Sequence, residues 1–226
     1  MRPVLLSPQV PTSAMLDRLD FQTDILPFII ATAGEFAALF FWLRFLDAGQ
    51  FVLANVLLWA GFAVERLSVY LWIRYVYRNR EGRTVRQPLG VTVAALFVIT
   101  LSEVLIWVLW LALADGQIAA VAAAAPATNM AVAGVVLMVL MTIEHSVEMG
   151  ALKQTSPWPY ITSPSTLLFT FMEVAGAVGW LAFVRADRPL LGALCLLVGL
   201  SIEHVLQGSD LRPEEEAVEG PATASA

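Results

Sequence analysis

Residues 130–151 read MAVAGVVLMVLMTIEHSVEMGA, an apolar run interrupted near its end by Glu144, His145 and Glu148. A helix crosses the hydrocarbon core of a bilayer in about 20 apolar residues, so this run predicts a transmembrane helix. Pro126 lies just before the run, and we expect it to break or kink the apolar stretch there. A charged side chain at the bilayer centre costs roughly 2.5–3.5 kcal/mol on insertion scales, so charged residues here indicate a functional site.

The motif Thr142-Ile143-Glu144-His145 inside this run has two counterparts in the chain. Each has a small residue, a β-branched residue, glutamate, and then a cation or imidazole, at Ala63–Arg66 and Ser201–His204. A second motif places Trp-Leu seven residues after a glutamate, at Glu35, Glu103 and Glu173. Because the two motifs alternate along the chain, they predict three copies of one helical hairpin.

Five further apolar runs extend the pattern, and the predicted spans are 26–46, 51–74, 90–113, 130–151, 165–184 and 189–207. We therefore expect an all-α, polytopic membrane protein with six transmembrane helices. The predicted hairpin repeats cover about 26–75, 90–152 and 165–208. Repeats of parallel orientation predict a pseudo-three-fold arrangement about an axis along the membrane normal.

The ends of the chain differ from this transmembrane domain, which we place at residues 26–208. Residues 1–25 are expected to form a cytoplasmic N-terminal segment. Residues 209–226 combine Pro, Ala, Ser and Glu without apolar periodicity, which predicts a disordered cytoplasmic tail.

Composition and charge support a multi-pass protein of the cell (inner) membrane, with the lipid bilayer as its partner. The chain of 226 residues is 58% hydrophobic and 14% charged, whereas a soluble domain carries about 25% charged residues. Six spans leave three positive residues on one side, Arg44, Arg185 and Arg188, and nine on the other. By the positive-inside rule both termini are then cytoplasmic. The sequence has no basic stripe with interleaved aromatics, so nothing indicates binding to nucleic acid. Cys195 is the only cysteine, which excludes an internal disulfide framework.

The most informative residues are glutamates inside the predicted spans. If they faced lipid unpaired, six of them would cost roughly 15–20 kcal/mol on the insertion scale, so we expect them to face the interior of the bundle. Carboxylates with imidazole are a ligand set for iron, manganese or zinc. The predicted divalent-metal ligands are Glu35, Glu103, Glu144, His145, Glu173, Glu203 and His204. The predicted supporting residues are Glu65, Arg66, Glu148 and Gln207.

Arg66 takes the place that imidazole holds in the other two repeats. We expect it to neutralise Glu65, and Glu35 as well, because a buried guanidinium can bond two carboxylates at once. The alternative is that Arg66 extends to the membrane interface.

Three functions remain open from the sequence. A membrane metalloprotein, either a redox or a hydrolytic enzyme, would use the glutamates and histidines as ligands. A cation or proton transporter would use the same layer as a path, and a structural subunit of a membrane complex would use the glutamates as hydrogen bonds between helices. In soluble carboxylate-bridged di-metal bundles the usual motif is Glu-x-x-His, whereas here glutamate and histidine are adjacent. No catalytic residue is predicted.

Two fragments, Leu101-Ser102-Glu103-Val104 and His204-Val205-Leu206-Gln207-Gly208, resemble short stretches of subunit III of haem–copper oxidases. The resemblance covers only these two fragments, and the other histidine-rich segments of that family are missing from the sequence. It therefore implies no function for this chain.

Overall fold

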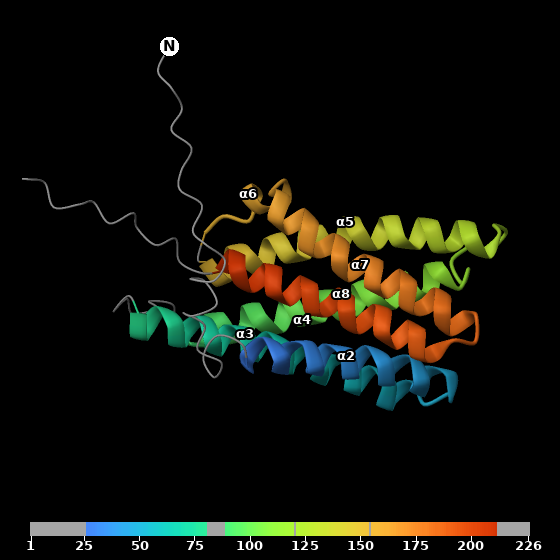
Figure 1. Ribbon diagram of the computed structural model, residues 1–226, viewed down its shortest axis with the longest axis horizontal. Coiled ribbons are helices and arrows are strands. Elements are labelled where there is room, and N and C mark those ends of the chain that lie inside the picture. Colours follow the sequence, from blue (N-terminus) through green and yellow to red (C-terminus); the bar gives the residue numbers. More distant parts are fainter. Residues whose placement is uncertain (1–25, 81–88, 120, 154, 212–226) are drawn as a thin grey trace, which may run out of the picture.

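The computed structural model describes residues 26–80, 89–119, 121–153 and 155–211, which form helices and turns without a strand. Six of these helices are long and apolar enough to cross a membrane. They are α2 (Leu26–Asp47), α3 (Phe51–Arg80), α4 (Leu89–Ala114), α5 (Pro126–Lys153), α7 (Pro164–Arg185) and α8 (Pro189–Leu211), and the short α6 (Trp158–Ile161) joins α5 to α7. The long helices lie roughly along one axis (Figure 1). The all-α, six-span prediction is confirmed, whereas the predicted N-terminal segment and most of the tail lie outside the described residues.

The start of α5 shows how proline shapes the spans. The apolar sequence continues from Ile118 through Ala125, yet the helix begins at Pro126. Proline is well tolerated in the first turn, where its missing N–H would have no partner, but not inside a helix. The predicted break at Pro126 is confirmed, and the predicted start of this span at residue 130 was four residues late.

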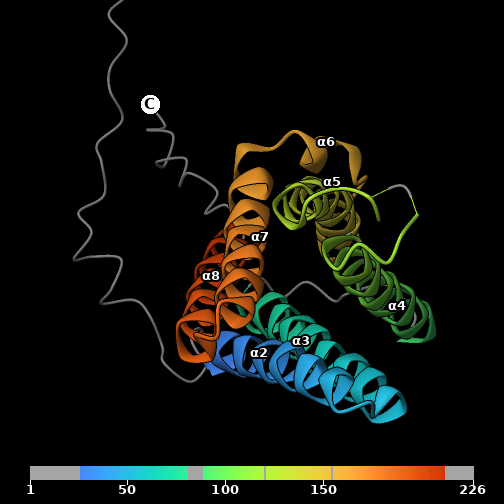
Figure 2. The same ribbon diagram turned by 90° about the vertical axis from the view of Figure 1, so that its right-hand side faces the viewer.

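The long helices pack as three antiparallel pairs, α2 with α3, α4 with α5, and α7 with α8 (Figure 2). The connections after Asp47 and Arg185 are short, so the two helices that each of them joins lie side by side. The second helix of each pair also contacts the first helix of another pair: α3 meets α4, α5 meets α7, and α8 meets α2. These contacts close the three pairs into a ring.

Glycine allows a close helix contact in this ring, between α7 and α8. A Cβ atom added to Gly176 would lie 2.9 Å from Gly199 Cα and 3.0 Å from the Cys195 carbonyl oxygen. Small residues let helix backbones approach in membranes, where the hydrophobic effect does not hold helices together. The α7–α8 pair is therefore fixed by direct backbone packing.

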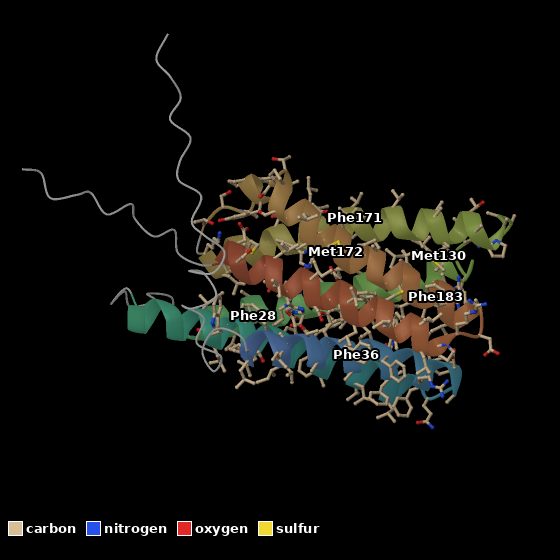
Figure 3. All side chains as sticks on the ribbon, viewed as in Figure 1. Phe28, Phe36, Met130, Phe171, Met172 and Phe183 are labelled. Atoms are coloured by element: carbon tan, nitrogen blue, oxygen red, sulfur yellow. The ribbon has the colours of Figure 1, made fainter. Side chains whose placement is uncertain are left out.

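The outward faces of the bundle are apolar. Large side chains such as Val98, Leu105 and Val205 are more than half exposed, and Phe171 lies on such a face of α7 (Figure 3). A water-soluble bundle would carry charged and polar residues there, with an apolar stripe only on the inside. The described structure is thus that of a multi-pass membrane protein.

The interior of the bundle is apolar toward both of its ends. We call the end where α2 begins and α8 ends the terminus end, and the end that carries the α2–α3 and α7–α8 connections the hairpin end. Toward the hairpin end the interior is a cluster of large apolar side chains, to which Phe36 and Met130 pack (Figure 3). It includes Trp42, Trp107, Trp110 and Trp180, each no more than 1% exposed.

Candidate metal centre

The glutamates of the repeated motifs form one layer across the bundle. Each lies eight to ten residues from the terminus end of its span, which is about 12–15 Å along the helix at 1.5 Å per residue. Each is at most 5% exposed. With Glu148 they make up the carboxylate layer: Glu35, Glu65, Glu103, Glu144, Glu148, Glu173 and Glu203.

One part of the layer surrounds Arg66, and we call it the arginine side. The Arg66 guanidinium donates from Nη2 to Glu103 Oε2 at 2.8 Å and to Glu144 Oε1 at 2.9 Å. Its Nε lies 3.3 Å from Glu65 Oε2, and its Nη1 contacts Glu148 Oε2. Four carboxylates from three helices therefore share one guanidinium.

Gln207 completes the arginine side from α8. Its Nε2 donates to Glu148 Oε2 at 2.8 Å, the same oxygen that Arg66 contacts. The predicted supporting residues Glu65, Arg66, Glu148 and Gln207 are therefore all part of this network.

The predicted partners of Arg66 need one correction. Arg66 is only 3% exposed, which rules out an interfacial position, and its pairing with Glu65 is confirmed. The expected pairing with Glu35 is wrong, because no ion pair joins the two side chains within the described residues. Glu35 lies instead beside His204, and Arg66 is taken up by carboxylates of α4 and α5.

The rest of the layer, which we call the histidine side, contains His145, His204, Glu35, Glu173 and Glu203. His204 Nδ1 lies 2.9 Å from the Leu200 carbonyl oxygen and 2.8 Å from Glu203 Oε2. A proton on Nδ1 can be donated to that carbonyl, which leaves the lone pair on Nε2. Nε2 faces two carboxylates, Glu35 Oε2 at 3.8 Å and Glu65 Oε1 at 3.7 Å.

His145 has the same kind of arrangement on α5. Its Nδ1 lies 2.8 Å from Thr170 Oγ1 on α7, and its Nε2 lies 3.4 Å from Glu173 Oε2 and 3.8 Å from Glu144 Oε2. In metal sites a histidine is commonly held by a hydrogen bond at the ring nitrogen that does not bind the metal. Both histidines are thus oriented with Nε2 toward carboxylates.

Glu173 is the least satisfied member of the layer. Its side chain is 2% exposed, and neither of its carboxylate oxygens has a hydrogen-bond partner among the described residues. An ionised carboxylate buried without partners is unfavourable by several kcal/mol. Glu173 therefore requires a proton, a cation or a metal ion.

Three groups of side chains have ligand atoms within 4.8 Å of one another. They are Glu35 with Glu203 and His204, Glu35 with Glu103 and Glu173, and Glu144 with His145 and Glu148. Zinc bonds to carboxylate and imidazole are about 2.0–2.2 Å long, so ligand atoms on one zinc ion are at most about 4.4 Å apart. Small side-chain movements would bring each group within that range.

The site was largely predictable as a set of residues, and its internal partners were not. All seven predicted metal ligands and all four supporting residues are buried in one region. Sequence reasoning missed Thr170, which holds His145, and the Leu200 carbonyl, which holds His204. The signal available for Thr170 was its spacing of three residues from Glu173, which places both on one face of α7.

No protein-family model, curated protein sequence or solved structure matches this chain.

Proposed function

We propose that this chain is a membrane metalloprotein whose carboxylate layer binds a divalent metal ion. The observation that carries the proposal is Glu173, a buried glutamate that has no hydrogen-bond partner among the described residues and faces the Nε2 atom of His145. A second histidine, His204, presents its Nε2 to Glu35 in a similar way. Because carboxylates and imidazoles suit iron, manganese and zinc, we propose one of these ions.

The proposal explains the layer better than hydrogen-bonded glutamates between helices do. Such glutamates stabilise a bundle only through the bonds that they make, and an unsatisfied buried group costs about 1–3 kcal/mol. Glu173 lacks these bonds at both oxygens, and Glu144 Oε2 and Glu148 Oε1 lack them too in the described structure. On the arginine side, each carboxylate still contacts Arg66 through one of its oxygens.

A transport path fits the interior less well. It would need polar groups between the layer and the hairpin end, because a charged or hydrated ion is unfavourable in an apolar interior. Within the described residues, Asn129 is the only buried polar side chain more than one turn beyond the layer in that direction. We therefore favour a fixed centre over a path that crosses the bundle.

The identity of the ion decides the reaction that the centre would support. Iron or manganese would supply redox chemistry, whereas zinc would polarise a bound oxygen as a Lewis acid. The role of the chain is to hold the ligands, keep both imidazoles oriented, and exclude water on the hairpin side. We favour an oxidoreductase for an iron or manganese centre.

Elemental analysis tests the proposal directly. The protein would be purified in mild detergent from cells supplied with iron, manganese and zinc, and its metal content per chain measured. We expect bound metal in the wild type and a clear loss in Glu173→Gln and Glu203→Ala. Ser201→Ala is the matched control on α8, since Ser201 Oγ bonds only to the Leu197 carbonyl of its own helix. A metal-free wild type would overturn the proposal.

We also propose that the three helix pairs are pseudo-three-fold repeats with both termini in the cytoplasm. The ring of contacts between the pairs and the buried glutamate and tryptophan in the first helix of each pair support the repeat. Reporter fusions within 81–88 and after residue 226 should both report the cytoplasm, whereas a fusion within 48–50 should report the opposite side. Reporters on opposite sides for the first two positions would exclude this topology.

A further inference from the structure

We propose that the carboxylate layer holds two metal ions bridged by Glu35. This inference rests on the proposed metal-binding function and adds a second ion and the residue that joins the two. Among the described residues, three groups of side chains could each hold an ion, and two of these groups contain Glu35. A carboxylate has two oxygens and can therefore bind two metal ions at once.

The first position combines α2 with α8. Its ligands are Glu35, Glu203 and His204, whose ligand atoms lie within 4.8 Å of one another. His204 Nε2 lies 3.8 Å from Glu35 Oε2, and the Leu200 carbonyl accepts from Nδ1 on the far side of the ring. The backbone of α8 thus holds the imidazole toward Glu35.

The second position combines α2 with α4 and α7. Its ligands are Glu35, Glu103 and Glu173, and His145 Nε2 lies 3.4 Å from Glu173 Oε2. Glu173 is the independent indication of a ligand here, since both of its oxygens are buried and neither has a hydrogen-bond partner in the part of the chain that the structure describes. The first position already has an imidazole, and His145 provides one beside the second.

The third group does not offer an equivalent position. Two of its three ligands are bound to Arg66, through Glu144 Oε1 at 2.9 Å and through Glu148 Oε2. A guanidinium keeps its positive charge in proteins, so it competes with any cation for these oxygens. The second position, in contrast, shares only Glu103 with Arg66. Arg66 therefore takes the place of a third ion, which leaves two positions.

The charges of the layer also favour two ions over one. Seven glutamates lie in the layer and Arg66 is the only cationic side chain that contacts them in the described structure, if both imidazoles are neutral. One divalent ion would leave seven negative charges against three positive, and two ions leave seven against five. Because an uncompensated buried charge is unfavourable, the second ion favours the folded layer by halving the remaining imbalance.

Metal titration of the purified full chain tests the inference. Apo protein would be prepared in detergent with a chelator and titrated with Mn²⁺, and binding would be followed by elemental analysis and by electron paramagnetic resonance. We expect two equivalents per chain and the spectrum of a magnetically coupled pair. One equivalent would overturn the bridged pair and leave the proposed metal centre intact, whereas no binding would overturn both. Two equivalents with the spectrum of isolated ions would overturn the bridge.

Three variants assign the ligands. His204→Ala should retain only the second position and Glu173→Gln only the first, so each should bind one equivalent with an uncoupled spectrum. Glu35→Gln should lower the affinity at both positions by at least tenfold. Loss at only one position in Glu35→Gln would overturn the bridging role. The wild-type stoichiometry and spectrum decide the matter even if a variant does not fold.

Discussion

The two sides of the carboxylate layer differ in what lies beside their buried carboxylates. On the arginine side, one guanidinium is in contact with Glu65, Glu103, Glu144 and Glu148, so positive charge is built into the chain. On the histidine side, Glu35, Glu173 and Glu203 lie beside the imidazoles of His145 and His204, which can be neutral, whereas a guanidinium is always charged. The difference arises at one position of the repeated motif, where Arg66 stands in place of the histidines.

Fold stability and metal binding are thus expected to depend on different residues of the same layer. A guanidinium bonded to carboxylates stabilises the fold and has no free coordination to offer. An imidazole whose Nδ1 is occupied keeps a lone pair on Nε2, which can bind a metal. Glu103 belongs to both sets of residues, since it contacts Arg66 and is a ligand of the second position. We therefore expect other changes on the arginine side to lower mainly stability, and changes on the histidine side to lower mainly metal content.

The largest effect is expected for Arg66→Leu. Removing one partner of a buried ion pair typically costs about 3–5 kcal/mol, and here four carboxylates lose their cation together. Arg66→His should lose less, because it recreates the motif of the other two repeats. Thermal melting of both variants in detergent measures the difference. Equal, small losses would contradict the internal role of Arg66.

A matched pair of isosteric changes compares the two sides directly. Glu173→Gln should weaken metal binding at its position by about 100-fold or more, equivalent to about 2.7 kcal/mol, because it removes a charged ligand. Glu148→Gln should keep the metal content of the wild type and lower the melting temperature, since Glu148 pairs with Arg66 and Gln207. Metal analysis and melting on the same samples provide both readouts. The reverse pattern would place the metal beside Arg66.

A smaller effect is expected from the residue that holds His145. Thr170→Val removes the partner of His145 Nδ1 and keeps the shape of the side chain. Loss of such a partner typically lowers metal affinity by about 10–100-fold. Ser146→Ala is the control, because Ser146 Oγ bonds to the Thr142 carbonyl within α5. Affinity would be measured by competition with a chelator, and equal affinities for the two variants would remove Thr170 from the site.

An effect on stability alone is expected for Gln207→Leu. This change removes one hydrogen bond to a charged carboxylate, which is worth about 1.5–3 kcal/mol of stability. Metal content should not change, since Gln207 donates its hydrogen bond to Glu148, which is a ligand of neither proposed metal position. Chemical or thermal unfolding in detergent measures the loss. A loss of metal in this variant would mean that the two sides are not independent.

The spans and the members of the layer were predictable because the sequence around them is uniformly apolar. Six long apolar runs leave little doubt about membrane helices, and a glutamate in such a run is conspicuous. The repeated motifs then singled out Glu35, Glu103 and Glu173 on the first helices of the pairs, and Glu144 and Glu203 on the second. All of these residues are buried in the described structure.

The partners within the layer were not predictable, because they depend on how the helices rotate against one another. Glu65 is the sequence neighbour of Arg66, so their pairing was expected. Glu103 and Glu144 lie 37 and 78 residues away from Arg66, and no local pattern reports which of the buried glutamates a guanidinium will reach. Glu35 was assigned to Arg66 wrongly for this reason. The pseudo-three-fold arrangement stays a prediction.

The buried tryptophans give the bundle a built-in optical reporter. Trp42, Trp110 and Trp180 each lie seven residues beyond a glutamate of the layer, which is about 10 Å along the helix toward the hairpin end. Each is at most 1% exposed, so solvent quenchers do not reach these indoles. An ion with unpaired d electrons in the layer would quench their fluorescence, whereas closed-shell zinc would leave it nearly unchanged. The emission of the native chain, without any added label, therefore distinguishes an iron or manganese centre from a zinc centre.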